Sequence, residues 1–458
     1  MRTTSRRALL RGAALLGAGA VVAACARQTN AVPSCHTSGP KTVVETGNAW
    51  INRVPRLLAT YRSQHPAVAV LPGSGAPAGR YVLKDAVGHE PPAAFVSLSP
   101  SLTALNFDPA TLLPGAFAAF ASARGTFGLP SFPHVTAVAW RTDVFGTLGL
   151  APPAPDWTLA DLESACEVVQ AAASAGSVPG LRGAMPVLVG ATPATDQRGR
   201  RVYIPGRLTK DVWAGFVLGY DGSIALDSHF SLTNSGALAG LDRLLEFVRR
   251  VGSLRTGVAP TGVTDNGADT TALQFVQYPF EAPGVLDPRW RFARFPRMPA
   301  VPVIPVEFQG LGVMDGQGAT AGGSADPTAL DAATGLLLWL YAPAQRAALS
   351  AVGVPPVDRD AGVQATFWAH APGFARPVGQ WQEFVDYMAG WPGVPAADPV
   401  TLEMESLLNG GGGSVTEWAR RASDGLNAAL SSVPASLPAV PVGPVAAYEV
   451  TIGSQTCP

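Results

Sequence analysis

Two kinds of hydrophobic pattern, one typical of strands and one typical of helices, alternate along the chain and are clearest at residues 126–170. An apolar run at residues 135–140 is bounded by polar residues 141–143 and predicts a buried strand. The segment before it, residues 128–133, is interrupted by prolines, which the interior of a helix does not accommodate. A short helical turn at residues 143–148 and a proline-rich loop should follow the strand.

A longer helix is expected to begin directly after Thr158. The Thr158 hydroxyl can cap this helix, and Asp161, three residues later, can act as the acidic partner of a capping box. The apolar side chains then recur at helical spacing, at Leu159, Leu162, Cys166 and Val169. Because Cys166 lies on that apolar face, we expect it to be a buried free thiol.

Strands and helices continue to alternate through the rest of the chain. The periodic segments predict strands at residues 42–46, 65–70 and within 178–190, and helices near residues 55–61, 235–251, 326–341 and 414–430. This order predicts an α/β protein whose parallel or mixed sheets are covered by helices. Ligands of such proteins bind at the carboxyl ends of strands, where the two halves of a sheet meet.

The first 24 residues predict export. Residues 5–11 (SRRALLR) form a twin-arginine region, and an apolar stretch of small residues too short to span a bilayer follows. Residues 22–25 (VAAC) match a lipobox, in which Cys25 becomes the lipidated first residue. We therefore expect residues 1–24 to be a twin-arginine lipoprotein signal peptide and residues 25–40 a tether. The alternative is an ordinary cleaved signal with an incidental cysteine.

Composition is that of a large folded protein rather than a disordered chain. Of its 458 residues 47% are hydrophobic and only 14% charged, which suffices for two lobes with separate cores. Removing residues 1–24 takes away four arginines and no acid, so the mature chain has 28 basic and 33 acidic residues and a net charge of −5. That balance argues against a nucleic-acid partner.

Three cysteines remain if Cys25 carries lipid. With Cys166 buried, Cys35 and Cys457 are left, both in loop-like terminal segments of an exported protein. We expect a disulfide bond between Cys35 and Cys457, with two free thiols as the alternative, because sequence does not show how closely the two residues approach.

The ordered motifs of residues 126–170 resemble the extracellular solute-binding proteins of ABC importers, family 1, which mostly bind sugars. The family's "yGLP" crossing, its strand ending in "yN" and its "GL.pP.TW" lead into a helix are matched in order by residues 127–130 (FGLP), 140–141 (WR), 149–150 (GL), 152–153 (PP) and Trp157. Similar matches extend over residues 42–430. The family's "PDv" strand is an exception, because residues 88–96 lack its aspartate.

The resemblance implies a two-lobe, periplasmic-binding-protein-like α/β fold with a ligand cleft between the lobes and three hinge crossings, near Leu129, Gly310 and Val354. Its expected parts are an N-terminal lobe of residues 41–130 and 312–353, a C-terminal lobe of residues 131–311 and 354–430, and a C-terminal extension of residues 431–458.

The implied function is a substrate-binding lipoprotein of an ABC importer, anchored by lipid to the outer face of the cytoplasmic membrane. It would be a monomer that captures a carbohydrate and delivers it to permease subunits, with no cofactor, metal or chemistry. The alternatives are an envelope scaffold or sensor with the same fold, a binder of a polyol or glycerophosphodiester, and a secreted glycan-acting enzyme. The chain contains no Gly-x-Ser-x-Gly, His-Glu-x-x-His or phosphate-loop motif.

The expected ligand site combines aromatic side chains that cover the apolar face of a sugar with polar side chains that bind its hydroxyls. The aromatic candidates are Trp50, Phe132, Tyr220 and Tyr278, and the polar candidates are Asn48, Ser99, His134, Asp221 and Gln309. The alternative for the aromatic residues is packing: Trp50 capping the first helix, Phe132 in the hinge and Tyr278 in a core.

Lipidation at Cys25 is directly testable. Two acyl chains bury enough methylene groups, at about 0.8 kcal/mol each, for stable membrane residence. Replacing Cys25 by Ala should therefore release the protein from membranes into the soluble fraction. A Cys25→Ala protein that stays membrane-bound after a carbonate wash contradicts the prediction.

Overall fold

The structure is a computed structural model of the whole chain, and it describes only part of the residues. The described residues are 42–46, 51, 54–71, 81–88, 95–104, 107–122, 125–178, 181, 187–189, 191–195, 201–205, 208–226, 229–251, 271–277, 289–315, 327–352, 354–370, 383–386, 407 and 412–431. The signal segment, the tether, the C-terminal extension and Cys25, Cys35 and Cys457 lie outside these residues. No helix among them is long and apolar enough to cross a membrane.

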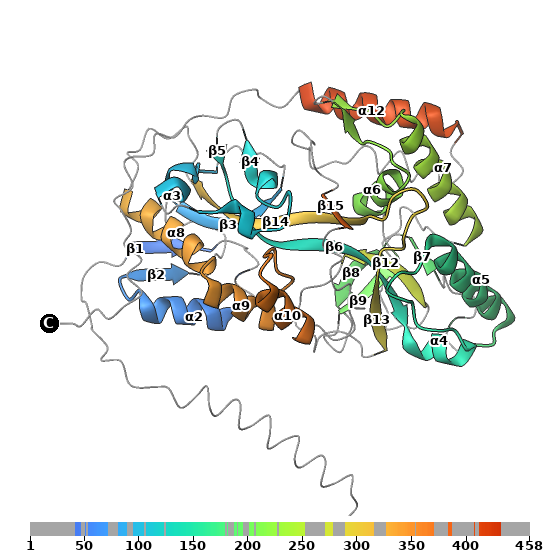
Figure 1. Cartoon of the computed structure of the whole chain (residues 1–458), viewed down its shortest axis with the longest axis horizontal. Helices are drawn as coiled ribbons and strands as arrows, with labels where there is room; N and C mark the ends of the chain where they lie inside the picture. Colours follow the sequence, from blue (N-terminus) through green and yellow to red (C-terminus); the bar gives the residue numbers. More distant parts are fainter. Residues whose placement is uncertain are drawn as a thin grey trace, which may run out of the picture.

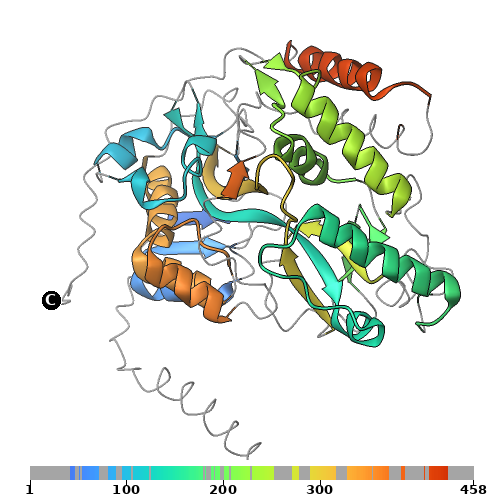
Figure 2. The same ribbon diagram turned by 45° about the vertical axis from the view of Figure 1, so that its right-hand side comes forward.

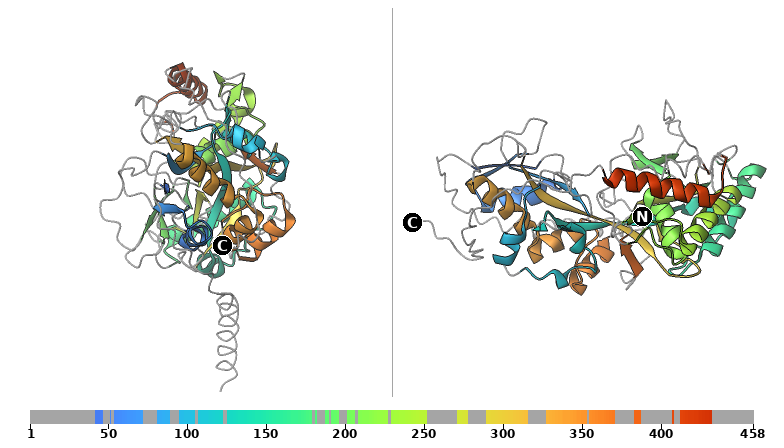
Figure 3. Two further views of the ribbon diagram at one scale, coloured as in Figure 1. Left: turned by 90° about the vertical axis from the view of Figure 1, so that its left-hand side faces the viewer. Right: turned by 90° about the horizontal axis from the view of Figure 1, so that it is seen from above.

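Two lobes lie side by side and are joined by two long strands, β6 (Leu129–Arg141) and β14 (Ile304–Asp315) (Figures 1 and 3). These strands belong to one nine-stranded sheet of order β2-β1-β3-β14-β6-β12-β7, with β13 paired to β6 and β15 to β14. Its other strands are β1 (Thr42–Glu45), β2 (Val68–Leu71), β3 (Tyr81–Val87), β7 (Val187–Leu188), β12 (Leu273–Gln277), β13 (Trp290–Arg294) and β15 (Phe384–Asp386).

The sheet combines parallel and antiparallel pairs, as expected for a mixed α/β protein. β1 is parallel to β2 and β3, whereas β14 is antiparallel to both β3 and β6. Three two-stranded ribbons accompany the main sheet: β4 (Ala121–Ser122) with β5 (Gly125–Thr126), β8 (Ala191–Thr195) with β9 (Arg201–Pro205), and β10 (Ala225–Leu226) with β11 (His229–Phe230).

Helices cover the sheet in both lobes (Figures 1 and 2). The N-terminal lobe carries α2 (Pro55–Gln64), α3 (Ser99–Ala104), the 3₁₀ turns Pro109–Thr111 and Ala118–Phe120, α8 (Pro327–Leu340) and α9 (Pro343–Ala351). The C-terminal lobe carries α4 (Thr142–Leu148), α5 (Leu159–Ala175), α6 (Lys210–Gly219), α7 (Ser235–Arg250) and α12 (Val415–Ser431).

The start of α5 is confirmed as predicted. The Thr158 backbone N–H donates to Asp161 Oδ2 at 2.8 Å, and the Asp161 N–H donates to Thr158 Oγ1 at 3.2 Å, which completes the capping box. Cys166 is a free and fully buried thiol, also as predicted. Burial raises the pKa of that thiol, so Cys166 is a core residue and not a nucleophile.

β6 begins earlier than the proline pattern indicated. The strand starts at Leu129 and includes Pro130 and Pro133, which lie opposite Gly310 and Phe308 of β14. In the first part of β6, β14 is the only strand partner among the described residues, whereas β12 and β13 flank the second part. Prolines are tolerated there because their missing N–H groups can face the unpaired edge.

In the part of the chain that the structure describes, the buried apolar side chains form three clusters. One occupies the C-terminal lobe around Trp213 and Trp418, and a second occupies the N-terminal lobe around Leu83 and Leu336. The third lies under the crossing strands and joins side chains of both lobes, such as Phe120, Val135, Phe292, Val306 and Phe308. The two lobes are therefore not separate cores with a bare linker, because apolar packing continues across their junction.

The helix α10 (Ala361–His370) packs against α9 and contributes Phe367 to the cluster under the crossing strands (Figure 1). The segment before it is also held by the N-terminal lobe, because the Leu113 N–H donates to Val357 O and the Arg359 N–H donates to Thr111 O. These contacts group α10 with α9 rather than with the C-terminal lobe. The lobe boundary expected at residue 354 stays a prediction.

Because the crossing strands pack closely, one added methyl group at the crossing should strongly affect the stability of the protein. A Cβ at Gly310 would collide with the Leu129 carbonyl oxygen and the Phe120 ring, so Gly310→Ala should destabilise the protein by about 1–3 kcal/mol. Gly146 in α4 has open space around it, and Gly146→Ala should instead stabilise by about 0.5–1 kcal/mol. Thermal unfolding of both variants tests this. Equal behaviour of the two alanines would contradict it.

Candidate functional site

A cluster of polar side chains lies where the crossing strands pass from one lobe to the other. Side chains alternate between the two faces of a strand, and on β6 the residues Phe132, His134 and Thr136 share one face. In the register with β14, Glu307 lies opposite His134 and Gln309 lies opposite Phe132. The other face of both strands is apolar and packs into the shared hydrophobic cluster. The polar side chains at the crossing therefore lie on the face that carries His134 and Glu307.

Glu307 is the centre of this cluster. Gln309 Nε2 donates to Glu307 Oε2 at 2.9 Å, His134 Nδ1 lies 3.7 Å from the same oxygen, and Lys210 Nζ lies 3.8 Å from Oε1. Burial by itself would raise the pKa of the Glu307 carboxyl. Neighbouring His134, Lys210 and Gln309 outweigh that effect and lower the pKa, so Glu307 is held as a carboxylate.

Asp211 lies beside this carboxylate in the first turn of α6. It is 1% exposed, and the Thr136 hydroxyl of β6 donates to its Oδ2 at 2.8 Å. Burial raises the pKa of the Asp211 carboxyl and the charge of Glu307 adds to the increase, while hydrogen bonds from the Thr209 and Thr136 hydroxyls oppose it. Two buried carboxyl groups thus lie at one junction: the pKa of Glu307 is lowered and the pKa of Asp211 is raised.

The cluster has an accessible layer and a supporting layer. The side chains of His134 and Lys210 are 22% and 28% exposed, and Gln309 is half-buried. Glu307, Asp211 and Thr136 lie buried among them. His134, Lys210 and Gln309 can therefore reach a solute, and the buried groups orient them.

The structure brings together three of the residues predicted from sequence: Phe132, His134 and Gln309. Phe132 is only 2% exposed, and its ring is tilted against the His134 ring with the centroids 5.1 Å apart. This burial favours the packing alternative for Phe132, which supports the imidazole from the side of the N-terminal lobe core.

Ser99 is placed elsewhere. It begins α3 in the N-terminal lobe, where its Oγ accepts a hydrogen bond of 2.9 Å from the Thr126 N–H. Its role as a ligand residue stays a prediction. The predicted ligand residues Asn48, Trp50 and Tyr278 lie outside the described residues.

Tyr220 and Asp221 lie at the far end of α6 from Lys210. They form the predicted turn, with Asp221 exposed at a φ of 59°, and the hairpin of β10 and β11 follows. The Tyr220 ring packs against the core of the C-terminal lobe and interacts with Arg243. The structure thus does not bring these two residues together with His134, and their binding role stays a prediction.

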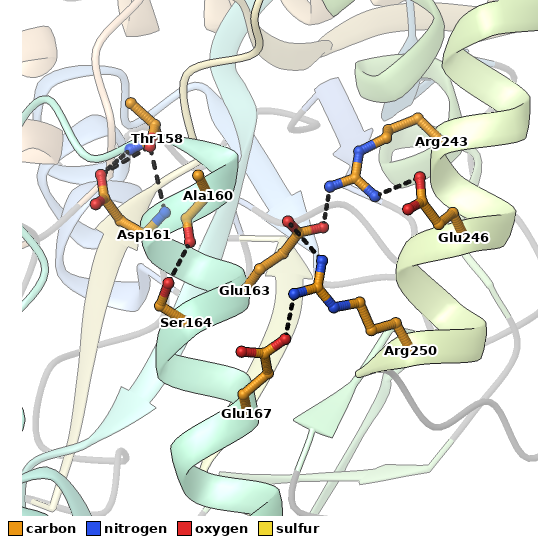
Figure 4. A network of polar contacts seen from close by, with 9 residues as sticks. All are labelled: Thr158, Ala160, Asp161, Glu163, Ser164, Glu167, Arg243, Glu246 and Arg250. Carbon is orange, nitrogen blue, oxygen red and sulfur yellow. Dashed lines mark hydrogen bonds and ion pairs between the residues drawn. The ribbon is translucent and has the colours of Figure 1, made fainter.

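Arg243 belongs to an ion-pair network that joins α5 to α7 (Figure 4). Arg243 and Arg250 of α7 both pair with Glu163 of α5, and Arg243 also pairs with Glu246 and Arg250 with Glu167. Glu163 is almost fully buried, whereas Glu246 and Glu167 are open to solvent. This network holds two helices of one lobe together. Tyr220 contacts Arg243 and therefore lies beside residues whose contacts are structural.

Sequence reasoning missed the four residues Thr136, Lys210, Asp211 and Glu307. Glu307 lies two positions before Gln309, so it shares the face of that predicted residue, and this spacing could have identified it. Lys210 and Asp211 precede the apolar run of α6, where charged residues usually mark a solvated helix start. Only the tertiary contact with β6 and β14 shows that Asp211 is buried.

A small cavity of about 20 Å³ lies beside Val354, near which the third crossing was predicted. The hydroxyls of Ser131 and Tyr341 meet there at 3.2 Å, and the buried Asp358 pairs with Arg346. Such a volume accommodates about one water molecule and no sugar. Among the described residues, no group of three or more His, Cys, Asp or Glu side chains could hold a metal ion. The polar cluster on the crossing strands remains the better candidate site.

No protein-family model and no curated protein matches the chain. Solved structures do match. The ABC substrate-binding protein Lmo0181 from Listeria monocytogenes, in complex with cycloalternan, has 14% identity and a TM-score of 0.58, with 86% of this chain and 99% of that chain covered. UgpB from Mycobacterium tuberculosis, in complex with glycerophosphocholine, has 14% identity and a TM-score of 0.59 over the same shares.

A third match is the cyclic alpha-maltosyl-1,6-maltose binding protein from Arthrobacter globiformis, with 16% identity, a TM-score of 0.57 and coverage of 86% of this chain and 99% of that chain. All three are solute-binding proteins. The chain therefore has the two-lobe α/β fold of periplasmic binding proteins, as the motif resemblance implied.

The lowered pKa of Glu307 predicts a pH-dependent contribution to stability. A carboxyl whose pKa is below its ordinary value of 4.5 stabilises the fold above that value, and the contribution is lost as the pH falls through the lowered pKa. Glu307→Gln should cost about 1–3 kcal/mol at neutral pH, because the hydrogen-bonded buried charge is lost.

This difference between Glu307→Gln and the unmodified protein should shrink in acid. Glu167→Gln is the matched control, because exposed ion pairs contribute only about 0–1 kcal/mol. Chemical unfolding across the acidic range measures both variants. A Glu307→Gln penalty that does not decrease with falling pH would disprove the assignment.

Proposed function

We propose that this protein is the solute-binding component of an ABC importer and that it captures a neutral carbohydrate between its two lobes for delivery to a membrane permease. The observation that carries this proposal is the polar cluster of His134, Lys210, Glu307 and Gln309 at the junction of the lobes. The fold and the binding proteins that share it support the same function. Those relatives are described with sugars, a polyol or glycerophosphocholine.

The charge state of the cluster favours a neutral solute. Lys210 is balanced by Glu307, and burial together with the charge of Glu307 raises the pKa of Asp211, which favours the neutral form of this carboxyl. An anionic or cationic solute would need a surplus of opposite charge, which these paired groups do not provide. Sugar hydroxyls both donate and accept, and the Gln309 amide, the His134 imidazole and the Lys210 ammonium can serve them.

Solute capture would work through the two crossing strands. A solute that contacts both lobes stabilises the closed arrangement in proportion to its differential affinity for that state. His134 and Glu307 lie on the crossing strands, and Lys210 begins a helix of the C-terminal lobe, so one solute could contact groups that belong to different parts of the hinge. No bond of the solute is made or broken in this process.

The mature protein would be held outside the cytoplasm by lipid at Cys25. This part of the proposal rests on the twin-arginine region and the lipobox of the first 25 residues. A binder of a polyol or glycerophosphodiester, and a scaffold or sensor with the same fold, are the alternatives that the binding experiment separates.

Solute binding can be measured by calorimetry with maltose, ribitol and glycerophosphocholine, followed by a wider panel of neutral glycans. We expect a neutral sugar to bind and to raise the melting temperature. His134→Ala and Lys210→Met should each weaken its binding about tenfold or more, which corresponds to about 1.4 kcal/mol. Lys84→Met is the matched control, because Lys84 is exposed on β3 and should leave affinity unchanged.

Three outcomes of this experiment would contradict the proposal. They are tight binding of glycerophosphocholine alone, no binding of any glycan, and release of a product from a bound glycan. Tyr220→Ala tests the aromatic candidate that the described residues leave open. Weaker binding at an unchanged melting temperature would make Tyr220 a ligand residue, and a lower melting temperature alone would make it a core residue.

A further inference from the structure

We propose that Asp211 is a positioning residue of the solute site that acts as a neutral carboxyl group, so that its ionisation weakens solute binding as the pH rises. This inference rests on the proposed function, because it concerns how the same site is regulated. Asp211 does not reach the accessible layer. It acts through Lys210, its neighbour in sequence.

The geometry makes Asp211 the link between α6 and the crossing strands. Its carboxyl group accepts the Thr136 hydroxyl of β6 at 2.8 Å, and both side chains are fully buried. This hydrogen bond fixes the first turn of α6 against β6. Lys210 lies in the same turn, and its Nζ is thereby held 3.8 Å from Glu307 Oε1.

The charges around Asp211 can be named from each element packed against it. The charge of Glu307 acts on it from β14, while Lys210 of α6 and His134 of β6 both contact Glu307. The helix α7 also packs on α6, but it brings Arg243 to the opposite end, at Tyr220. Lys210 pairs with Glu307, and the charge of Glu307 disfavours ionisation of Asp211.

Ionisation of Asp211 would leave one buried negative charge without compensation. Such a charge is costly, and the site can relieve it by drawing Lys210 away from Glu307 or by loosening the first turn of α6. Either movement displaces Lys210 from the accessible layer. Burial and the charge of Glu307 raise the pKa of Asp211, so the neutral form persists above its ordinary range and is lost as the pH rises further.

Binding titrations at a series of pH values, from about pH 4 to pH 9, test the inference with maltose, ribitol and glycerophosphocholine as separate probes. In the unmodified protein, affinity for the probe that binds should fall about tenfold or more with rising pH. Asp211→Asn is neutral at every pH and can still accept the Thr136 hydroxyl, so it should bind tightly with no such fall. Asp211→Ala should bind weakly throughout.

Asp242→Asn, on the exposed face of α7, makes the same chemical change away from the site and should keep the pH dependence of the unmodified protein. The inference is overturned if affinity does not change with pH, if Asp211→Asn keeps the pH dependence, or if Asp211→Asn binds as weakly as Asp211→Ala. If Asp211→Ala fails to fold, the pH dependence of binding by Asp211→Asn still tests the inference.

A second measurement separates this inference from the proposed function. The carbon-13 NMR signal of the Asp211 carboxyl, assigned by its disappearance in Asp211→Asn, reports ionisation in the protein without any solute. A titration midpoint above the ordinary range of aspartate supports the inference, and an Asp211 already ionised in mild acid overturns it. Both results hold whether or not one of the three probes binds.

Discussion

The pairing of β6 with β14 is the constraint on which the rest of the structure depends. These two strands carry the chain between the lobes, and every other strand of the main sheet is joined to them directly or through one or two neighbours. A strand has only two faces. On one face, Val135, Val306 and Phe308 close the shared hydrophobic cluster, so the polar residues of the crossing must lie on the other. The candidate site and the shared hydrophobic cluster thus lie on opposite faces of the same strand pair.

The polar face brings stability and binding into conflict. Two carboxyl groups are buried next to each other, and one of them is compensated by Lys210. An apolar replacement of similar volume would often be more stable, because buried ion pairs seldom recover their desolvation cost. The position of Glu307 and Asp211 is therefore easier to explain by the contacts that they make with His134, Lys210 and Thr136 than by the stability of the fold.

The match to solute-binding proteins at 14–16% identity illustrates that very different sequences can form the same fold. The fold requires glycine where backbones approach closely, as at Gly310, and apolar residues at alternate positions of the crossing strands. A shared fold does not fix the solute, and solved structures of this fold are described with a sugar, a polyol and glycerophosphocholine.

Local chemistry in the sequence was enough to predict much of the fold. The capping box of Thr158 and Asp161, the burial of Cys166 and the helices α5, α7, α8 and α12 follow from neighbouring residues and from periodicity, and all are present. His134 and Gln309 were predicted as ligand residues; the structure places both beside Glu307, and their binding role stays a prediction. The prolines of β6 misled the prediction of its start, because whether a missing N–H is costly depends on a strand partner far along the chain.

Most of the buried half of the candidate site could not be predicted from the sequence. Thr136 and Asp211 come from separate elements, and neither stands out in its own segment, whereas Glu307 could have been found from its spacing to Gln309. Tyr220 shows the converse, because it has the right residue type in the right turn but lies at the wrong end of α6 to join His134. Local periodicity determines which residues form a helix or strand. Only the tertiary structure decides which ends of those elements come into contact. Those contacts determine whether a charged side chain is buried.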